Sequence, residues 1–245
     1  MIEVQKVHKT FGDNHVLRGI DLTALEGRTT VIIGGSGSGK SVLMKHMIGL
    51  LRPDRGRVLV DGEDTTGLSE RELTRVRAKF GMVFQSAALF DSMTVGENVA
   101  FPLREHRRLP EKEIRRIVAE KLALVDLAGI ERLYPAELSG GMRKRVGLAR
   151  AIVLEPKIIL YDEPTTGLDP INAHSVDEMI QNAKARLGVT SVVITHDIAS
   201  SFRIGDHIAM IHEGLIVEQG SAEDLRRSRH PFVQKFLATW FAKGE

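Results

Sequence analysis

The chain has 245 residues, of which 42% are hydrophobic and 27% charged, and its formal net charge is +2. This composition is typical of a globular domain and excludes a strongly basic chain built to coat nucleic acid. The sequence has no cysteine, so disulfides and thiolate metal sites are excluded and a reducing compartment fits. Its apolar runs are shorter than the roughly 18 residues of a membrane span, and its N-terminus has no apolar signal core. We therefore expect a cytosolic protein that reaches a membrane only through a partner.

The first part of the chain predicts short strands joined by tight turns, including a hairpin around Asp61-Gly62. Near-continuous apolar runs are typical of buried parallel strands, and the chain has three of them: Val31–Ile33, Ile158–Tyr161 and Val192–Thr195. Each run ends in polar residues. Because ligands bind at the carboxyl ends of strands in α/β sheets, we expect the functional site there.

Helices are predicted between these strands. Ser69 and Glu72 have the spacing of a capping box at the start of one helix. Apolar residues recur at helical spacing from Ile114 to Val125, which predicts a second helix that ends at Gly129. The stretch from approximately 87 to 156 has little strand pattern, so we expect a helical subdomain inserted into the core. The tail predicts a hairpin over 207–220 and a helix over approximately 231–242.

The segment GGSGSGKS matches a phosphate-binding loop, with a strand pattern before it and a helix pattern after it. Glycines let such a loop wrap around a phosphate with its backbone N–H groups pointing inward. A plain Gly/Ser linker is the alternative, and the two matching flanks disfavour it. We expect Lys40 to reach the β- and γ-phosphates and Ser41 to give its hydroxyl to Mg²⁺. The residues expected to bind nucleotide are Gly34, Gly35, Ser36, Gly37, Ser38, Gly39, Lys40 and Ser41.

Polar side chains at the ends of two other strands extend this site. Asp162 ends the run before it, where a carboxylate holds Mg²⁺ through water in P-loop enzymes. Consecutive strand residues point to opposite sides, so Glu163 is free to orient or deprotonate the attacking water. His196 ends the next strand, and we expect it to bond the γ-phosphate or that water. Taken alone, each residue is more often a turn, cap or structural residue.

A second anion-binding helix start is predicted at LSGGMRKR, where Ser139, Gly140 and Gly141 precede a run of helix formers. We interpret the basic run 143–145 (Arg-Lys-Arg) as a solvated helix face, and a phosphate role for it is the less favoured alternative. One chain therefore carries two helix starts suited to an anion, which needs an explanation.

Together these segments resemble the nucleotide-binding subunits of ATP-binding cassette (ABC) transporters over essentially the whole chain. The phosphate loop is followed, in the family's order, by a Q-loop glutamine, a signature, two carboxylates, a D-loop and a switch histidine: Gln85, LSGGM at 138–142, Asp162 with Glu163, Asp169, and His196. The resemblance implies ATP and Mg²⁺ as ligands. It implies Glu163, His196, Lys40 and Gln85 in catalysis, and a metal held by Ser41, Gln85 and Asp162. It also implies contacts to nucleotide from Phe11 and Asp169.

The resemblance also explains the two helix starts. In the family, two copies arranged head to tail hold ATP between them, so the signature of one (Ser139, Gly140 and Gly141) caps ATP on the other's phosphate loop. The implied fold is an α/β P-loop NTPase core with a mostly parallel sheet, an N-terminal antiparallel β subdomain and an inserted helical subdomain, in one domain over 1–245. The implied partners are a second copy and membrane permease subunits, not nucleic acid, at the cytoplasmic face of the inner membrane.

Several positions depart from the usual family pattern. Met142 replaces the signature glutamine, Phe11 replaces a tyrosine expected to stack on adenine, and Gly35 stands where proline is common. The D-loop begins Thr-Gly in place of the commoner Ser-Ala. None of these changes removes a group that the chemistry needs.

The stretches around the motifs also look like the ATPases of Mce-type lipid transporters, including the maintenance-of-lipid-asymmetry system of Gram-negative bacteria. That narrower resemblance implies phospholipid transport, with an Mce-domain protein and a small accessory subunit as further partners. The nearest alternative is an importer of amino acids or other small solutes. A soluble ABC ATPase acting on DNA or ribosomes would usually have coiled-coil arms, zinc-binding cysteines or two cassettes. A P-loop kinase would leave the signature and Gln85 unexplained.

Two further surfaces follow from the same resemblance. Residues 86–103 are expected to form part of the groove for a permease's coupling helix, although at least one of Leu89, Phe90 and Phe101 is expected in the core. The tail places five apolar residues on one helix face, which either packs on the chain's own core or docks on a partner: Phe232, Phe236, Leu237, Trp240 and Phe241.

Overall fold

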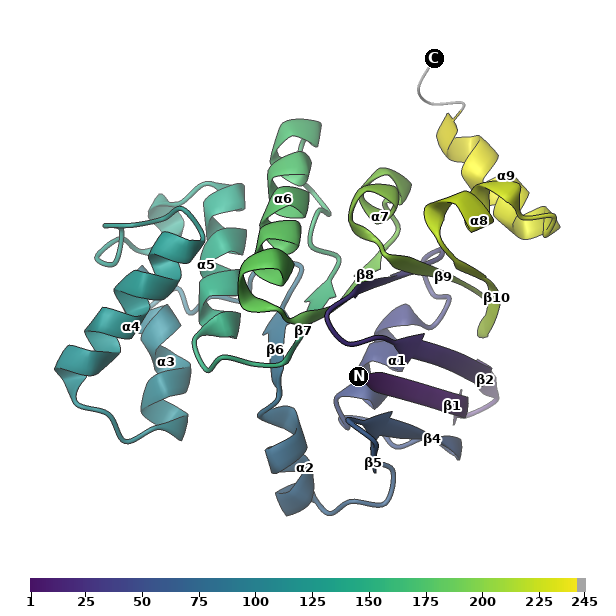
Figure 1. Ribbon diagram of the computed structural model, residues 1–245, viewed down its shortest axis with the longest axis horizontal. Coiled ribbons are helices and arrows are strands. Elements are labelled where there is room, and N and C mark those ends of the chain that lie inside the picture. Colours follow the sequence, from purple (N-terminus) through teal and green to yellow (C-terminus); the bar gives the residue numbers. More distant parts are fainter. Residues whose placement is uncertain (242–245) are drawn as a thin grey trace.

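The computed structural model describes residues 1–241, apart from the side chains of Trp240 and Phe241. Over that range it has a six-stranded and a four-stranded sheet with helices around them (Figure 1). The α/β architecture predicted from the sequence is confirmed. Within residues 1–241, no helix is both long enough and apolar enough to cross a bilayer.

The larger sheet has the strand order β10-β9-β3-β8-β7-β6. Its strands are β3 (Thr29–Ile33), β6 (Phe80–Val83), β7 (Ile158–Asp162), β8 (Thr190–Thr195), β9 (His207–His212) and β10 (Leu215–Gly220). The pairs from β9 to β6 are parallel, and β10 pairs antiparallel with β9. The three predicted apolar runs lie in β3, β7 and β8, and every residue of β3 and β8 is buried. Because these strands are parallel, the segments that follow them meet at one edge.

The smaller sheet is antiparallel and has the order β2-β1-β4-β5. Its strands are β1 (Ile2–Phe11), β2 (Asn14–Ala24), β4 (Arg55–Val60) and β5 (Glu63–Asp64). The predicted hairpin is present: Asp61 and Gly62 have φ values of 52° and 78°, the left-handed backbone of a two-residue hairpin turn. Buried side chains of this sheet share one apolar core with α1 and the larger sheet.

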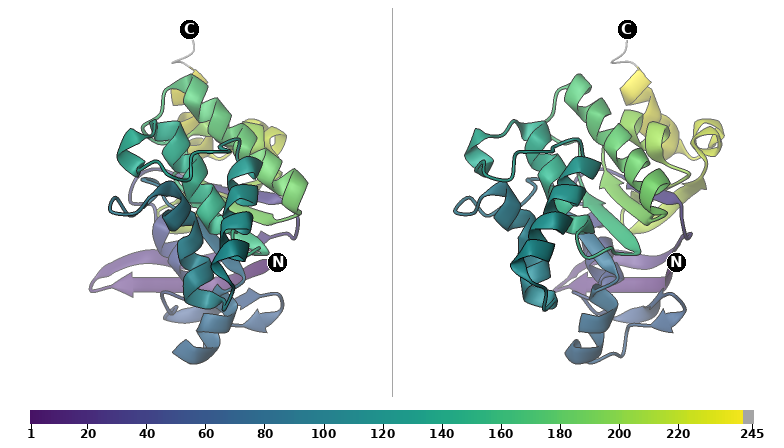
Figure 2. Two further views of the ribbon diagram at one scale, coloured as in Figure 1. Left: turned by 90° about the vertical axis from the view of Figure 1, so that its left-hand side faces the viewer. Right: turned by 60° about the vertical axis from the view of Figure 1, so that its left-hand side comes forward.

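The helices fall into groups along the chain: α1 (Lys40–Met47), α2 (Glu70–Arg77), α3 (Val95–His106), α4 (Glu111–Leu124), the 3-10 turn η1 (Pro135–Glu137), α5 (Gly140–Ile152), α6 (Pro170–Leu187), α7 (Ile198–Ile204), α8 (Ala222–Arg227) and α9 (Pro231–Phe241). Figures 1 and 2 show α3, α4 and α5, in teal, as one group at one side of the molecule. They pack on one another through buried Val99, Leu122 and Val146. The predicted capping box of Ser69 and Glu72 opens α2.

Two local expectations are wrong. The helix predicted to reach Gly129 ends at Leu124, because Asp126 takes a left-handed φ of 57° and the Leu127 N–H bonds back to the Leu122 carbonyl. The run 143–145 is not a solvated face. Lys144 is buried because α5 packs against the loop after β7, and its Nζ donates to the carbonyls of Pro164 and Thr166.

The tail helix α9 begins at Pro231 as predicted and packs on the chain's own core. Val233 and Leu237 are buried there, and the Phe232 ring stacks on His212 with centroids 3.5 Å apart. Of the two alternatives left open by the sequence, packing on the chain's own core holds for this part of the helix. The side chains of Trp240 and Phe241, and residue 242, lie outside the described residues.

Candidate functional site

A cleft opens beyond the carboxyl ends of β3, β7 and β8. The described residues that line it come from the phosphate loop, α1, the segments after β6, β7 and β8, and α9: Gly35, Ser36, Gly37, Lys40, Ser41, Gln85, Glu163, Thr166, His196, Ile198, Phe236 and Thr239. The structure therefore brings together the phosphate loop, the glutamine, the glutamate and the histidine that the sequence singled out.

The loop between β3 and α1 has a shape that only glycine allows at several points. Gly37 and Gly39 have φ values of 76° and 105°, in the left-handed region. A Cβ at Gly34 would lie 2.3 Å from the Ile211 carbonyl oxygen. Gly39 is also the N-cap of α1 and provides no side-chain cap. The first N–H groups of α1 are thus uncapped donors, which fits a phosphate at this position.

Lys40 is held inside this loop. Its side chain is 8% exposed, and Nζ donates to the carbonyls of Gly34 and Gly35 over 2.8 and 3.0 Å. Burial lowers the pKa of Lys40, and the charges of Glu163 and Asp162 oppose that shift. A phosphate oxygen is a stronger acceptor for this cation than a neutral carbonyl. The lysine is therefore placed to bind an anion in the loop.

Glu163 lies at the centre of the cleft. Its Oε2 accepts hydrogen bonds from His196 Nδ1 at 2.8 Å and from Thr166 Oγ1 at 3.0 Å, and its Oε1 is 3.9 Å from Lys40 Nζ. The backbone of Glu163 is left-handed, with φ of 49°, which is unusual for glutamate. Its N–H donates to the Ile194 carbonyl over 2.8 Å. The chain thus turns sharply after β7, and neighbours fix the carboxylate.

The contact with Glu163 also determines which ring nitrogen of His196 acts as the donor. An ionised carboxylate only accepts hydrogen bonds, so Nδ1 carries the proton in this pair. The second nitrogen, Nε2, is left for another partner. The His196 side chain is 58% exposed, so that partner can come from the cleft or from solvent.

Asp162, Ser41 and Gln85 are the residues expected around a metal. Asp162 ends β7 opposite Ile194. Its pKa is raised by burial and by the charge of Glu163, while Lys40 and Lys45 pull it down. A cation nearby would relieve this cost of keeping Asp162 ionised.

The donor set fits Mg²⁺ that is shared with a phosphate. Among the residues that the structure describes, no group of three or more His, Asp or Glu side chains could hold a metal alone. Mg²⁺ is usually bound through one or two protein oxygens together with substrate phosphates and water. Ser41 and Gln85, which line the cleft, offer a hydroxyl and an amide oxygen for such a shared site.

The signature residues lie outside this cleft. Ser139 is the N-cap of α5, and Gly140 and Gly141 are its first residues. None of the three is among the described residues that line the cleft. The Ser139 Oγ accepts a hydrogen bond from the Met142 N–H over 3.2 Å, so it caps its own helix. A Cβ at Gly140 would be 3.5 Å from Leu168. The helix start therefore packs against the D-loop.

Asp169 and Phe11 are likewise not among the described residues that line the cleft. Asp169 is the N-cap of α6 and accepts hydrogen bonds from the N–H groups of Ile171 and Asn172. Phe11 ends β1 with 46% of its surface exposed, and Lys9 Nζ is 5.5 Å from its ring centroid. Phe11 therefore presents an exposed ring there, with the Lys9 ammonium over one face.

Some residues of the cleft were not predicted from the sequence. Thr166 donates a hydrogen bond to Glu163 from three residues further along the chain. The signal that could have found it is the hydroxyl at that spacing in the segment after β7. Phe236 and Thr239 reach the cleft from α9. No local pattern pointed to them, since only the docking of α9 brings them there.

Comparison with known proteins identifies the family. The ABC transporter family model matches residues 17–166. The chain is 46% identical to the "probable ribonucleotide transport ATP-binding protein mkl" of Mycobacterium tuberculosis, over 96% of this chain and 66% of that protein. It therefore spans a little less than two thirds of that relative's length. It is 43% identical to the "intermembrane phospholipid transport system ATP-binding protein MlaF" of Haemophilus influenzae, over 100% of this chain and 91% of that protein.

Solved structures agree with this assignment. A dimeric post-hydrolysis ATP-binding cassette, bound to ADP and Pi, superimposes with a TM-score of 0.81 at 32% identity, covering 91% of this chain and 99% of that one. The predicted resemblance to ABC subunits, including those of lipid transport systems, is thus confirmed. With the phosphate loop, Glu163 and His196 in one cleft, the chain belongs to the ABC transporter family and is an ATP-binding cassette ATPase.

Proposed function

We propose that this ATPase drives phospholipid transport between membranes as part of an Mce-type transporter. Support comes from the phospholipid-transport relative of Haemophilus influenzae, which is 43% identical over 100% of this chain. The relative with a ribonucleotide-transport name is slightly more identical, at 46% over 96% of this chain, so ribonucleotide transport is the alternative that the experiment must exclude. A comparable phospholipid-transport ATPase of Escherichia coli is 42% identical over 97% of this chain.

The hydrolytic step rests on one observation above all, the fixed carboxylate of Glu163. With Oε2 occupied by His196 and Thr166, Oε1 is the oxygen free to orient the attacking water and accept its proton. Lys40 would neutralise charge on the β- and γ-phosphates, and the His196 Nε2 would bond the γ-phosphate. Ser41, Asp162 and Gln85 would hold Mg²⁺, which supplies further charge neutralisation on the phosphates.

Two copies are needed for a complete site in this proposal. Dimeric cassettes are among the similar solved structures. The signature begins a helix outside the cleft of its own chain, as described above, so it is available to another copy. We propose that Ser139, Gly140 and Gly141 cap ATP held by the partner's phosphate loop in a head-to-tail dimer, with Asp169 at the same interface.

The contact with a permease would lie near Gln85 and the segment 86–103. Phe84 and Phe90 are exposed there by 37% and 43%. The Phe90 ring packs on Phe101 with centroids 5.1 Å apart, and Leu89 packs on the core. A surface aromatic pair in the segment after Gln85 suits a partner helix. Through it the chain would attach peripherally to the permease, at the cytoplasmic face of the membrane. The group α3–α5 would then act as the helical subdomain, over approximately 87–156 of a single domain.

The test is transport by the complex assembled from this chain, its permease and any Mce-domain protein. Donor vesicles carrying a fluorescent phospholipid should lose it to acceptor vesicles only with Mg-ATP, and Glu163→Gln should stop the transfer. ATP-dependent movement of ribonucleotides or amino acids, with no lipid transfer, would contradict the lipid assignment and leave the ATPase assignment intact.

A further inference from the structure

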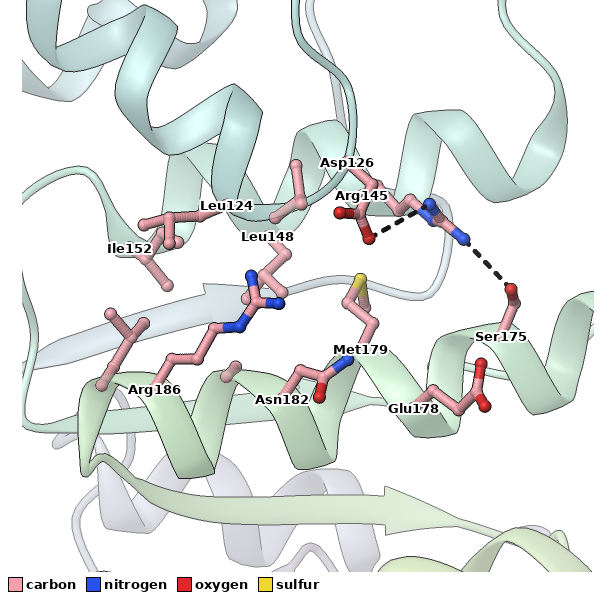
Figure 3. Close-up of a pocket in the computed structure, with 13 residues that line it drawn as sticks. Leu124, Asp126, Arg145, Leu148, Ile152, Ser175, Glu178, Met179, Asn182 and Arg186 are labelled. Carbon is pink, nitrogen blue, oxygen red and sulfur yellow. Dashed lines mark hydrogen bonds and ion pairs between the residues drawn. The ribbon is translucent and has the colours of Figure 1, made fainter.

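The buried side chain of Lys144 stands apart from the other basic residues at the start of α5. Arg143 donates to the Leu138 carbonyl over 2.9 Å, within its own segment. Arg145 donates to Ser175 Oγ over 3.0 Å and lies 3.9 Å from Asp126, at the rim of a pocket between α4, α5 and α6 (Figure 3). Lys144 alone of these three points to the loop that follows Glu163. It is 5% exposed and donates to two backbone carbonyls, of Pro164 and of Thr166.

That loop carries the group that holds the catalytic carboxylate. Thr166 donates its hydroxyl to Glu163 Oε2 over 3.0 Å, and its N–H donates to the Glu163 carbonyl over 3.3 Å. Lys144 bonds the carbonyl of the same threonine over 3.4 Å. One continuous set of hydrogen bonds therefore runs from α5 through Thr166 to Glu163.

The electrostatics support the same link. Burial lowers the pKa of Lys144, and attraction to the Glu163 charge opposes that shift. A cation that is removed from solvent needs good acceptors, and backbone carbonyls outside helix and sheet provide them. Lys144 therefore ties the loop over residues 164–166 to α5.

We propose that Lys144 is a positioning residue for hydrolysis: it fixes the loop after β7 so that Thr166 holds Glu163 in its productive orientation. Since Lys144 lies on the helix that starts at Ser139, the same tether joins the signature to the chain's own carboxylate. A shift of α5, when the signature engages a phosphate, would be transmitted to Glu163. This inference rests on the proposed role of Glu163 in activating water.

Steady-state ATPase kinetics of the purified chain, or of the assembled transporter, test this role. Lys144→Met keeps most of the side-chain volume and removes the charge and donors. We expect kcat to fall about tenfold or more, because small displacements of a catalytic group are costly in rate, while KM for ATP changes less than about twofold. Lys144→Arg, which keeps charge and donors, should recover much of the lost kcat.

Lys121 provides a matched control. Lys121 lies on α4 and is also 5% exposed. Its Nζ pairs at 3.0 Å with Glu155, which follows the C-terminal end of α5, the end away from Ser139. Lys121→Met should lower thermal stability as much as Lys144→Met does and leave kcat per folded molecule unchanged. Equal kcat losses in the two variants, or a Lys144→Met enzyme with parental kcat, would overturn the proposal.

A double-mutant cycle locates the effect. Thr166→Val removes the hydroxyl bond to Glu163, so its kcat loss should not add to that of Lys144→Met if both act on the same carboxylate. Fully additive losses would contradict the tether. If Lys144→Met does not fold, Lys144→Gln, whose amide still donates, takes its place in every arm. A Glu163→Gln enzyme with normal turnover would instead refute the proposed role of Glu163 in hydrolysis, whatever Lys144 does.

Discussion

The two helix starts suited to an anion, at α1 and at α5, are built in opposite ways. The start of α1 has a glycine N-cap with a left-handed backbone and no side-chain cap, so its N–H groups are uncapped, and it carries a buried lysine. The start of α5 is capped by its own Ser139, which accepts from the Met142 N–H. Its buried lysine, Lys144, does not face the helix start but donates to the loop after β7.

This difference assigns them different tasks. The start of α1 has the free donors and the charge to bind a phosphate by itself. At α5, Ser139 Oγ is already an acceptor, so its O–H proton is the donor left to point outward. A helix dipole without an added charge contributes only about 0.3–1 kcal/mol to anion binding. The α5 start is therefore a fixed but weak cap, which suits a phosphate held mainly by another copy.

Lys40→Ala should have the largest effect, because it removes the cation from the α1 start. We expect hydrolysis to be abolished and ATP affinity to fall by about tenfold or more, since a buried charge-assisted bond is lost. Nucleotide titration and phosphate release measure the two effects. Lys112→Ala, on the exposed side of α4, is the control. Near-parental turnover in folded Lys40→Ala would contradict the assignment of the phosphate loop.

Glu163→Gln should come next. The amide keeps the shape of the side chain but cannot accept the proton of water, so kcat should fall by about 10²–10⁴ while Mg-ATP binding is kept. The expected product is a closed dimer that retains ATP, which size-exclusion chromatography with bound-nucleotide analysis detects. Hydrolysis at the parental rate would exclude Glu163 as the residue that activates water.

Ser139→Ala should affect the α5 start without touching the α1 start. ATP binding to the monomer should be unchanged, while ATP-dependent dimerisation and kcat fall by about tenfold or more for one lost hydrogen bond to a charged group. Loss of the helix cap also costs about 0.5–2 kcal/mol of stability. Ser221→Ala removes a similar cap from α8 and controls for that cost. If both variants lose the same activity, the effect of Ser139 is only structural.

The smallest effect is expected at α9, because this helix supplies none of the N–H donors at the starts of α1 and α5. Phe236→Ala should weaken the packing of α9, so amide hydrogens over 231–239 should exchange faster. ATP affinity should stay within about threefold, because Phe236 lines the cleft but offers no polar group to the phosphates. Unfolding of the whole chain, or unchanged exchange, would contradict this view of a peripheral helix.

The sequence predicted those parts of the fold whose cause is local. The buried strands β3, β7 and β8 follow from unbroken apolar runs, and the loop before Lys40 follows from glycine spacing. Features made by distant contacts were not predictable in this way. The burial of Lys144 depends on the loop at 164–166, and the approach of Phe236 to the cleft depends on how α9 docks. The end of α4 at Leu124 needed the left-handed backbone of Asp126, which the apolar periodicity did not reveal.

The central claim is that the two helix starts of one chain serve two different ATP molecules, and a disulfide crosslink tests it most directly. The chain has no cysteine of its own, so Ser139→Cys in one protomer and Ser36→Cys in a differently tagged protomer are the sole reactive pair. We predict a crosslink between the two tagged chains that forms with Mg-ATP in the Glu163→Gln background and not without nucleotide. If both substitutions are placed in one chain and the disulfide forms only within that chain, each copy completes its own site and the claim is wrong.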